Sequence, residues 1–240
     1  MFPIGDENRG QRLRPVVNYG LIALNFLVFF YELAQSDPEL NRFIYRWGTI
    51  PTEIMDGQRL VTLVTSQFLH AGWLHILGNM LFLWVFGDNV EDTMGHVGYL
   101  IFYLLCGVAA AVAQVAVNSG SPTPLVGASG AISGVLAAYL VLFPRGKIRT
   151  FVLLGWFPLI FLLPAWVMIG YWIVLQFING FLSLGVRTEE GSGVAYFAHV
   201  GGFLAGLVLV NLFKNEDAHQ RQLAAREGRR AFQRVGWDRG

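Results

Sequence analysis

Long runs of apolar residues dominate the pattern of hydrophobic and polar positions along this chain. A membrane-spanning helix needs about 20 consecutive, mostly apolar residues. The segments that satisfy this requirement directly are Val16–Ala34, Trp73–Val90, Val97–Val117, Leu125–Phe143 and Val194–Phe213. The pattern therefore predicts at least five membrane spans.

A stretch without any charged residue, Phe151–Val186, lies before the last of these segments. It is too long for one span and barely long enough for two spans and a turn. Pro158 and Pro164 interrupt it, and a proline inside a helix removes a backbone hydrogen bond and clashes with the preceding turn. We therefore expect Phe151–Leu163 to be an interfacial or re-entrant piece, and Ala165–Leu182 to be a sixth span.

The basic residues support this count. Of the 17 Lys and Arg residues, 13 lie in residues 1–15, in Arg145–Arg149 and in Lys214–Gly240. The others are Arg42, Arg46, Arg59 and Arg187. Cytoplasmic loops of membrane proteins are enriched in Lys and Arg. Six spans place the three basic segments on one side, whereas a seventh span would move the tail to the other side. We expect both termini in the cytoplasm.

Composition points to the same class of protein. Hydrophobic residues make up 54% of the 240 residues and charged residues only 14%, whereas soluble domains carry about a quarter charged residues. Cys106 is the single cysteine, so a disulfide framework is excluded. The sequence predicts an all-α membrane protein, with residues 1–15 as a cytoplasmic segment, 16–213 as a six-helix domain and 214–240 as a basic cytoplasmic tail. The long loop after the first span is expected to be partly structured.

Few polar residues interrupt the predicted spans, and such residues usually mark function or helix contacts. The second span carries His75 and Asn79, with His70 just before it. The fourth contains Gly127-Ala128-Ser129-Gly130, and the sixth contains His199. A serine at a helix start often only caps the helix, and a lone core histidine is more often structural. The glycines around Ser129 and His199 favour a functional role for these two residues.

Glycines on the fourth and sixth spans predict a close helix contact. Residues three and four apart share a helical face, and glycines on such a face let two helices approach closely. The fourth span offers Gly127, Gly130 and Gly134, and the sixth offers His199, Gly202 and Gly206. Packing these faces together would bring the imidazole of His199 towards the hydroxyl of Ser129.

Serine and histidine in contact predict acyl-transfer chemistry. A serine hydroxyl becomes a good nucleophile when an adjacent base takes its proton. Because every Asp and Glu lies in a loop, a tail or a span end, we expect a Ser–His dyad without a carboxylate. His75 and Asn79, four residues apart, would supply an oxyanion hole together with the backbone N–H of Ser129. Asn79 could alternatively form only an interhelical hydrogen bond, and a structural or gating role is expected for His70.

Other motifs fail. The sequence around Ser129 lacks the second glycine of a nucleophile elbow, and the histidines do not form H-E-x-x-H. No metal and no cofactor are predicted, and nothing suggests nucleic-acid binding. A transporter or channel would require charged residues along a pathway or repeated broken helices, and neither is found.

The order of the polar motifs resembles the rhomboid family. The resemblance extends from the second to the sixth span, and the motifs that carry it are His70, H-x-x-x-N at His75 and Asn79, Gly127-Ala128-Ser129-Gly130, Ala198-His199-Val200-Gly201-Gly202, and G-x-x-x-E-x-x-x-G at Gly87, Glu91 and Gly95. In some members a tyrosine four residues after the nucleophile supports the histidine ring. Here that position is Ser133, and Tyr196 or Phe197 are the expected substitutes.

The resemblance implies an intramembrane serine endopeptidase with a six-helix fold. Ser129 would be the nucleophile, His199 the general base, and His75, Asn79 and the Ser129 amide the oxyanion hole, with Glu91 in a supporting role. The implied partners are membrane lipid and single-span membrane proteins cleaved within or beside their helix. The alternative is an inactive member that binds membrane clients. A bacterial inner membrane is the expected location, and the sequence leaves the oligomeric state open.

Overall fold

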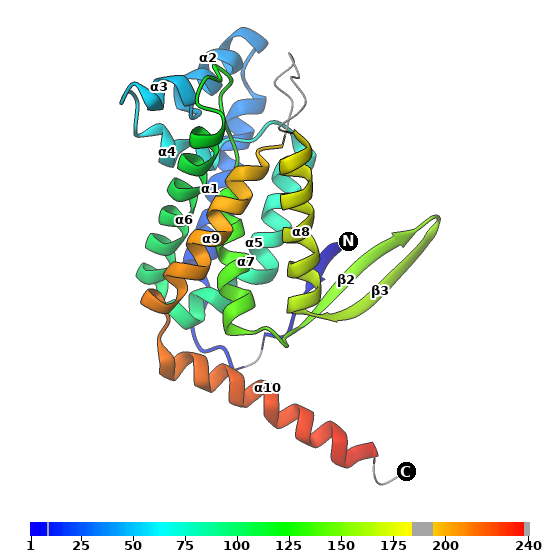
Figure 1. Ribbon diagram of the computed structural model, residues 1–240. Helices are drawn as coiled ribbons and strands as arrows, with labels where there is room; N and C mark the ends of the chain where they lie inside the picture. The colour runs from blue at the N-terminus through cyan, green and yellow to red at the C-terminus, as the bar shows by residue number, and fades with distance from the viewer. Residues whose placement is uncertain (9, 184–193, 238–240) are drawn as a thin grey trace.

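The computed structural model describes residues 1–8, 10–183 and 194–237. Of the predicted features, Arg9, Arg187 and residues 238–240 of the basic tail lie outside the described residues. The main body is a bundle of long helices (Figure 1). They are α1 (Val16–Leu33), α5 (Trp73–Met94), α6 (His96–Val117), α7 (Ser129–Leu142), α8 (Ala165–Ser183) and α9 (Tyr196–Phe213). Most bounds agree with the predicted spans to within a few residues.

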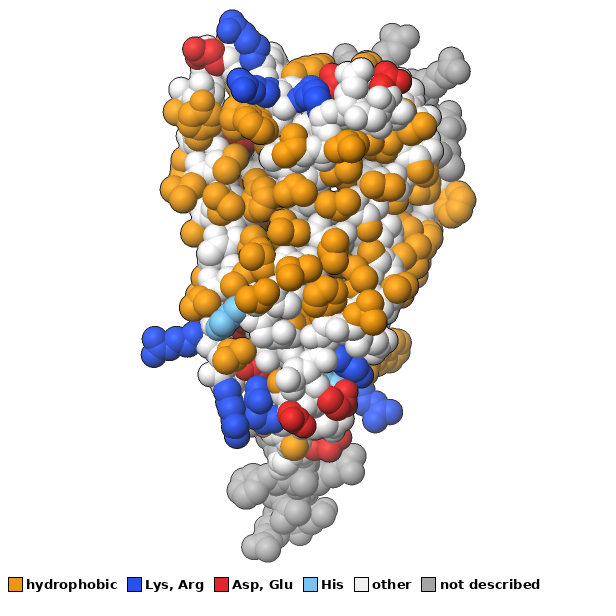
Figure 2. Space-filling model, turned by 90° about the vertical axis from the view of Figure 1, so that its left-hand side faces the viewer, with side chains coloured by type: hydrophobic (Ala, Val, Ile, Leu, Met, Phe, Trp, Pro, Cys, Tyr) orange, Lys and Arg blue, Asp and Glu red, His pale blue; other side chains and the backbone are white. Residues whose placement is uncertain are grey.

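Most of the long helices have the length and composition of membrane spans. Within the described residues, α1, α6, α8 and α9 are each long and apolar enough to cross a membrane, and α5 with the bent segment Thr62–Phe68 makes a fifth candidate. Figure 2 shows a broad apolar band across the middle of one face of the molecule, with charged side chains above and below it. The protein is therefore an integral membrane protein with four or five candidate spans, and a sixth crossing stays a prediction.

Helix α7 is shorter than the sequence predicts. It begins at Ser129 rather than at Leu125, because Leu125 forms an isolated β-bridge with Thr49 instead. Its 14 residues give a length of about 21 Å at 1.5 Å per residue, less than the hydrocarbon core of a bilayer. The helix packs against α5, α6 and α9 and is almost wholly buried.

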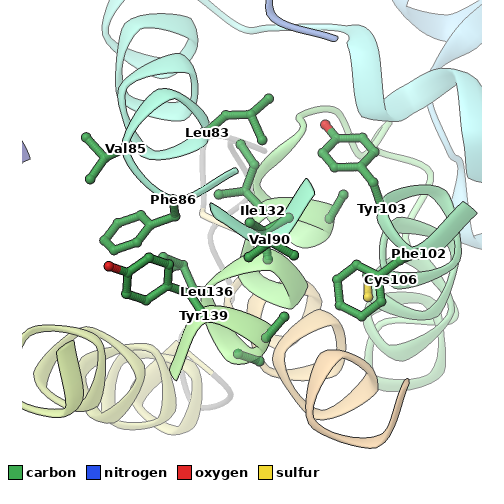
Figure 3. Close-up of a cluster of buried hydrophobic side chains, with 14 of the residues drawn as sticks. Leu83, Val85, Phe86, Val90, Phe102, Tyr103, Cys106, Ile132, Leu136 and Tyr139 are labelled. Carbon is green, nitrogen blue, oxygen red and sulfur yellow. The ribbon is translucent and has the colours of Figure 1, made fainter. Parts of the chain in front are cut away.

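The hydrophobic core lies between α5, α6 and α7 (Figure 3). Phe86 of α5 packs edge-on against Tyr139 of α7, with ring centroids 4.9 Å apart. Cys106 of α6 is fully buried in this cluster and acts as a small apolar side chain. The other members shown from α5 and α6 are Leu83, Val85, Val90, Phe102 and Tyr103. This core fixes the central helix α7 in the bundle.

A small sheet corrects the all-α expectation. Strands β2 (Lys147–Leu154) and β3 (Phe157–Pro164) form an antiparallel hairpin, and β1 (Phe2–Gly5) pairs with β2. The predicted interfacial piece is therefore a hairpin that projects sideways from the bundle (Figure 1). Gly155, at φ 60°, and its neighbour form the two-residue turn, while the prolines of β3 disfavour a helix.

The long connection after α1 is structured, as expected. It contains α2 (Asp37–Trp47), α3 (Pro51–Met55), α4 (Thr62–Thr65) and a 3₁₀ turn at Ser66–Phe68. These short helices gather at one end of the bundle (Figure 1).

The N-terminal segment and the C-terminal helix α10 (Glu216–Trp237) meet at the opposite end. Asp92 near the end of α5 accepts hydrogen bonds from the backbone N–H groups of Arg12 and Leu13, and from the side chain of Arg221. The two predicted cytoplasmic segments therefore lie at one end of the molecule.

Candidate active site

Ser129 and His199 face each other across two neighbouring helices. Ser129 is the first residue of α7, and His199 lies in the first turn of α9. The Oγ of Ser129 is 2.8 Å from Nε2 of His199. This is the distance of a hydrogen bond through which a serine proton passes to an imidazole.

Glycines bring these two helices together. A Cβ added to Gly206 would lie 2.5 Å from the carbonyl oxygen of Gly134, and one added to Gly202 would overlap the carbonyl oxygen of Gly130. A Cβ on Gly130 would also lie 2.5 Å from Cβ of Ala110 on α6. A larger side chain at Gly202 or Gly206 would force α7 and α9 apart and lengthen the contact between serine and histidine, whereas one at Gly130 would press on α6.

Gly127 differs from its predicted role. It precedes α7 and has φ +128°, a conformation that L side chains rarely adopt. An added Cβ would lie 2.8 Å from Cε1 and Nε2 of His75 rather than against α9. Gly127 therefore leaves room for the imidazole of His75 beside Ser129, instead of belonging to the glycine face of the helix.

Helix α8 supplies two contacts to the imidazole that the sequence analysis missed. The Oε1 of Gln176 lies 2.8 Å from Nδ1 of His199. The ring of Trp172, one turn earlier, lies 5.6 Å from the His199 ring at an interplanar angle of 38°. These residues provide the support expected from Tyr196 or Phe197. The signal for Gln176 was present in the sequence, because it is an amide within an otherwise apolar span.

Ser133, at the position where some rhomboids carry a tyrosine, forms its hydrogen bond within α7 rather than with the histidine. Ser133 lies one turn after Ser129, and its Oγ donates a hydrogen bond of 2.6 Å to the Ser129 carbonyl oxygen. This contact ties the first turn of α7 to its second turn.

His75 and Asn79 lie on the face of α5 that borders the same site. The Nδ2 of Asn79 is 3.0 Å from Nε2 of His70, and the rings of His70 and His75 meet edge-on at 5.1 Å. An amide nitrogen carries two hydrogens, so Asn79 has one left when the other binds His70. The backbone N–H of Ser129 has no carbonyl partner within α7, because it opens the helix. His75, Asn79 and Ser129 thus line the same cavity.

Two buried carboxylates hold the two ends of the first helix. Glu32, at the end of α1, accepts the backbone N–H of His70 at 3.3 Å. Glu91 accepts the backbone N–H groups of Val17 and Asn18 at 3.0 and 2.7 Å. Glu91 therefore caps the start of α1, at the end of the bundle away from Ser129. The supporting role predicted for Glu91 is thus a contact with α1 and not a contact with the site.

A cavity of about 610 Å³ contains the site. Its lining includes Ser129, His199, His75, Asn79 and Trp172. Small residues, among them Gly107, Ala110 and Ala111 of α6, form part of its wall. Ser129, His199, His75 and Asn79 therefore line one cavity.

Comparison with known proteins shows which family this chain resembles in sequence. Residues 57–216 match the family model described as Rhomboid domain. Rhomboid protein 1, mitochondrial, from Saccharomyces cerevisiae is 28% identical over 199 residues, which cover 79% of this chain and 51% of the relative. Rhomboid protease GluP from Bacillus subtilis is 32% identical over 130 residues, covering 54% of this chain and 25% of the relative.

A plant relative has a similar level of identity. Rhomboid-like protein 11, chloroplastic, from Arabidopsis thaliana is 31% identical over 150 residues, covering 61% of this chain and 50% of the relative. The chain thus spans about half, or less, of the length of these curated relatives. Several relatives are named as mitochondrial or chloroplastic proteins, so these comparisons do not support the expected bacterial inner membrane.

Proposed function

The chain belongs to the rhomboid family, and from this premise we propose that it is an intramembrane serine endopeptidase. Its substrates are single-span membrane proteins, cleaved within or beside the transmembrane helix. The observation that carries the proposal is the 2.8 Å contact between Ser129 Oγ and His199 Nε2 in a cavity that also holds His75 and Asn79. Family membership alone would not support protease activity. Acyl transfer requires a serine activated by a base, and the Ser–His contact meets this requirement.

In the proposed reaction, Ser129 Oγ attacks the carbonyl carbon of the peptide bond while His199 Nε2 takes the hydroxyl proton. The carbonyl oxygen becomes negatively charged and accepts hydrogen bonds from the Ser129 N–H, His75 and Asn79. When the tetrahedral intermediate collapses, the C–N bond breaks and the imidazolium of His199 returns its proton to the leaving amine. Water then hydrolyses the acyl-enzyme with His199 acting again as base.

The proposed topology has six membrane crossings, with α7 as the short central one. Residues 16–213 form the protease domain, and residues 1–15 and 214–240 lie in the cytoplasm. Support comes from the N-terminal segment, the connection between α7 and α8, and α10, which lie at one end and carry most of the basic residues. Ser129 then lies towards the opposite, extracytoplasmic side. The proposed membrane is the bacterial inner (plasma) membrane.

The test uses purified protein in detergent with a panel of single-span substrates. Wild type should cleave at least one of them, and Ser129→Ala and His199→Ala should each lower the rate by more than about 10³-fold. Ser183→Ala is the matched control, because Ser183 Oγ bonds the Gly180 carbonyl within α8 and Ser183 is not among the residues that line the cavity. A wild-type protein that cleaves no substrate and does not react with a fluorophosphonate probe would instead be an inactive, client-binding member.

A further inference from the structure

Gln176 is the residue of α8 that contacts the proposed base directly. Its Oε1 lies 2.8 Å from Nδ1 of His199, while the other ring nitrogen of His199 contacts Ser129. Gln176 is buried. An amide within a membrane-spanning helix is costly unless its polar atoms find partners, so the position of Gln176 needs a physical reason.

A second hydrogen bond fixes which way the amide of Gln176 faces. Its Nε2 donates to the backbone carbonyl oxygen of Trp172 at 3.3 Å. This contact commits the NH₂ group to the helix backbone and leaves Oε1 facing the imidazole. In the opposite orientation the NH₂ group would point at Nδ1, and the carbonyl of Trp172 would meet another acceptor.

The orientation of the amide determines the tautomer of His199. An amide oxygen only accepts hydrogen bonds, so Nδ1 of the neutral imidazole carries the ring hydrogen. The lone pair is then on Nε2, which faces the hydroxyl of Ser129. This is the tautomer in which a histidine takes a proton from serine. The other tautomer would present an N–H to Ser129 and could not act as base.

We propose that Gln176 is a positioning residue that holds His199 in the tautomer and orientation required to deprotonate Ser129. Its neutral amide lies where the carboxylate lies in a Ser–His–Asp triad, next to the second nitrogen of the imidazole. The inference rests on the proposed function and deepens it, because it adds a third member to the predicted dyad. Trp172 of the same helix packs on the imidazole, so α8 supports both the edge and the face of the ring.

The competing role for Gln176 is a simple hydrogen bond between α8 and α9, as polar residues often form in membrane bundles. Gln114 of α6 provides the matched comparison. Its Oε1 accepts the backbone N–H of Ala198 at 3.2 Å, next to His199, without touching the imidazole. Replacing Gln114 therefore removes an interhelical hydrogen bond and leaves the tautomer of His199 unaffected.

The experiment compares wild type with Gln176→Met, Gln176→Glu and Gln114→Met in kcat, KM and the pH profile of kcat. Gln176→Met should lower kcat about 10- to 100-fold with KM nearly unchanged. Gln176→Glu restores an acceptor, so its kcat should exceed that of Gln176→Met. A carboxylate beside the imidazolium favours protonation, which should move the acid limb of the Gln176→Glu profile to higher pH. Gln114→Met should keep the wild-type profile.

A second readout does not need catalysis. In protein with ¹⁵N-labelled histidine, the resonances of His199, assigned with His199→Ala, should show the Nδ1–H tautomer in wild type and a mixture in Gln176→Met. A wild-type kcat in Gln176→Met, or one tautomer population in both proteins, overturns the inference. A wild type that cleaves nothing, while Gln176→Met still changes the tautomer, overturns the proposed function and leaves the positioning of His199 by Gln176 intact.

Discussion

Gly202 of α9 lies directly against the backbone carbonyl of Gly130 on α7. Gly130 follows Ser129 in the chain, and Gly202 lies one turn after His199. The close approach of the two backbones and the 2.8 Å contact between serine and histidine are therefore parts of one helix interface. Because Gly130 also meets α6 at Ala110, α7 has little freedom to move away from a larger side chain.

Replacing Gly202 by alanine should separate Ser129 from His199. The added methyl group overlaps a backbone atom, which cannot rotate away, and overpacking of this kind costs about 1–3 kcal/mol of stability. A displacement of about 1 Å at the reacting atoms lowers rates by up to about 10²-fold. We expect Gly202→Ala to lower both the thermal unfolding midpoint and kcat. Gly20→Ala on α1, where nothing lies within 4 Å of an added Cβ, is the control and should change neither.

Gly127→Ala should impair the proposed oxyanion hole more than the fold. Alanine is strained at φ +128°, and its Cβ would lie 2.8 Å from the imidazole of His75. The ring must shift, because the loop before α7 is held by the bond from Gly127 N–H to the Ser66 carbonyl. We expect kcat to fall at least about 10-fold, with a smaller relative change in the unfolding midpoint. Equal activity of Gly127→Ala and wild type would exclude a catalytic arrangement that needs His75 in this place.

The sequence predicted the helices and the contact between Ser129 and His199 because each leaves a strong local signal. Runs of about 20 apolar residues define spans, and glycines three and four residues apart define a contact face for Ser129 and His199. Gln176 was missed although its signal was of the same kind. It is a single amide in an apolar run, and only the three-dimensional arrangement shows that it faces the second nitrogen of His199.

The hairpin of β2 and β3 was missed for a different reason. A strand is recognised by alternating apolar and polar residues, but from Phe151 to Pro164 the hairpin is apolar on both faces and leaves no alternation to detect. Its exposed side chains include Leu154, Trp156 and Phe157. Length and the two prolines excluded a regular span, and only the pairing of Leu154 with Phe157 around a two-residue turn identifies a hairpin.

Stability should fall as pH rises through neutrality because of Asp6. Its carboxyl accepts hydrogen bonds from Tyr139 Oη at 2.6 Å and Asn89 Nδ2 at 2.7 Å. Burial, reinforced by the charge of Asp88, raises the pKa of Asp6 to about 7. The folded protein thus keeps a proton that the unfolded chain releases near pH 4. The stabilising effect of this proton is complete below about pH 4 and is lost as pH rises through about 7.

Asp6→Asn removes this titration. Thermal unfolding midpoints of wild type and Asp6→Asn, measured in detergent between pH 4 and pH 8, should diverge with rising pH, wild type losing more stability. Parallel curves across this range would show that Asp6 does not carry the dependence.

Arg226 should fasten helix α10 to the bundle. Its guanidinium carbon lies 4.1 Å from the ring centroid of Phe143, and Nη2 donates a 2.6 Å hydrogen bond to Oδ1 of Asn89. The residue is only 6% exposed. Truncation to alanine removes a desolvated cation–π contact of about 2 kcal/mol and leaves a buried amide oxygen unpaired, at a cost of about 1–3 kcal/mol. Arg226→Ala should lower the unfolding midpoint and speed tryptic cleavage within α10.

Two further variants separate charge from geometry at this position. Arg226→Lys keeps the charge but lacks the planar fork that both stacks on Phe143 and bonds Asn89, so it should recover only part of the loss. Arg42→Ala removes an exposed cation on α2 at the other end of the bundle and should match wild type in both measurements. If Arg226→Ala behaved like Arg42→Ala, α10 would be held by its contacts through Arg221 and Gln222 with Asp92 rather than by Arg226.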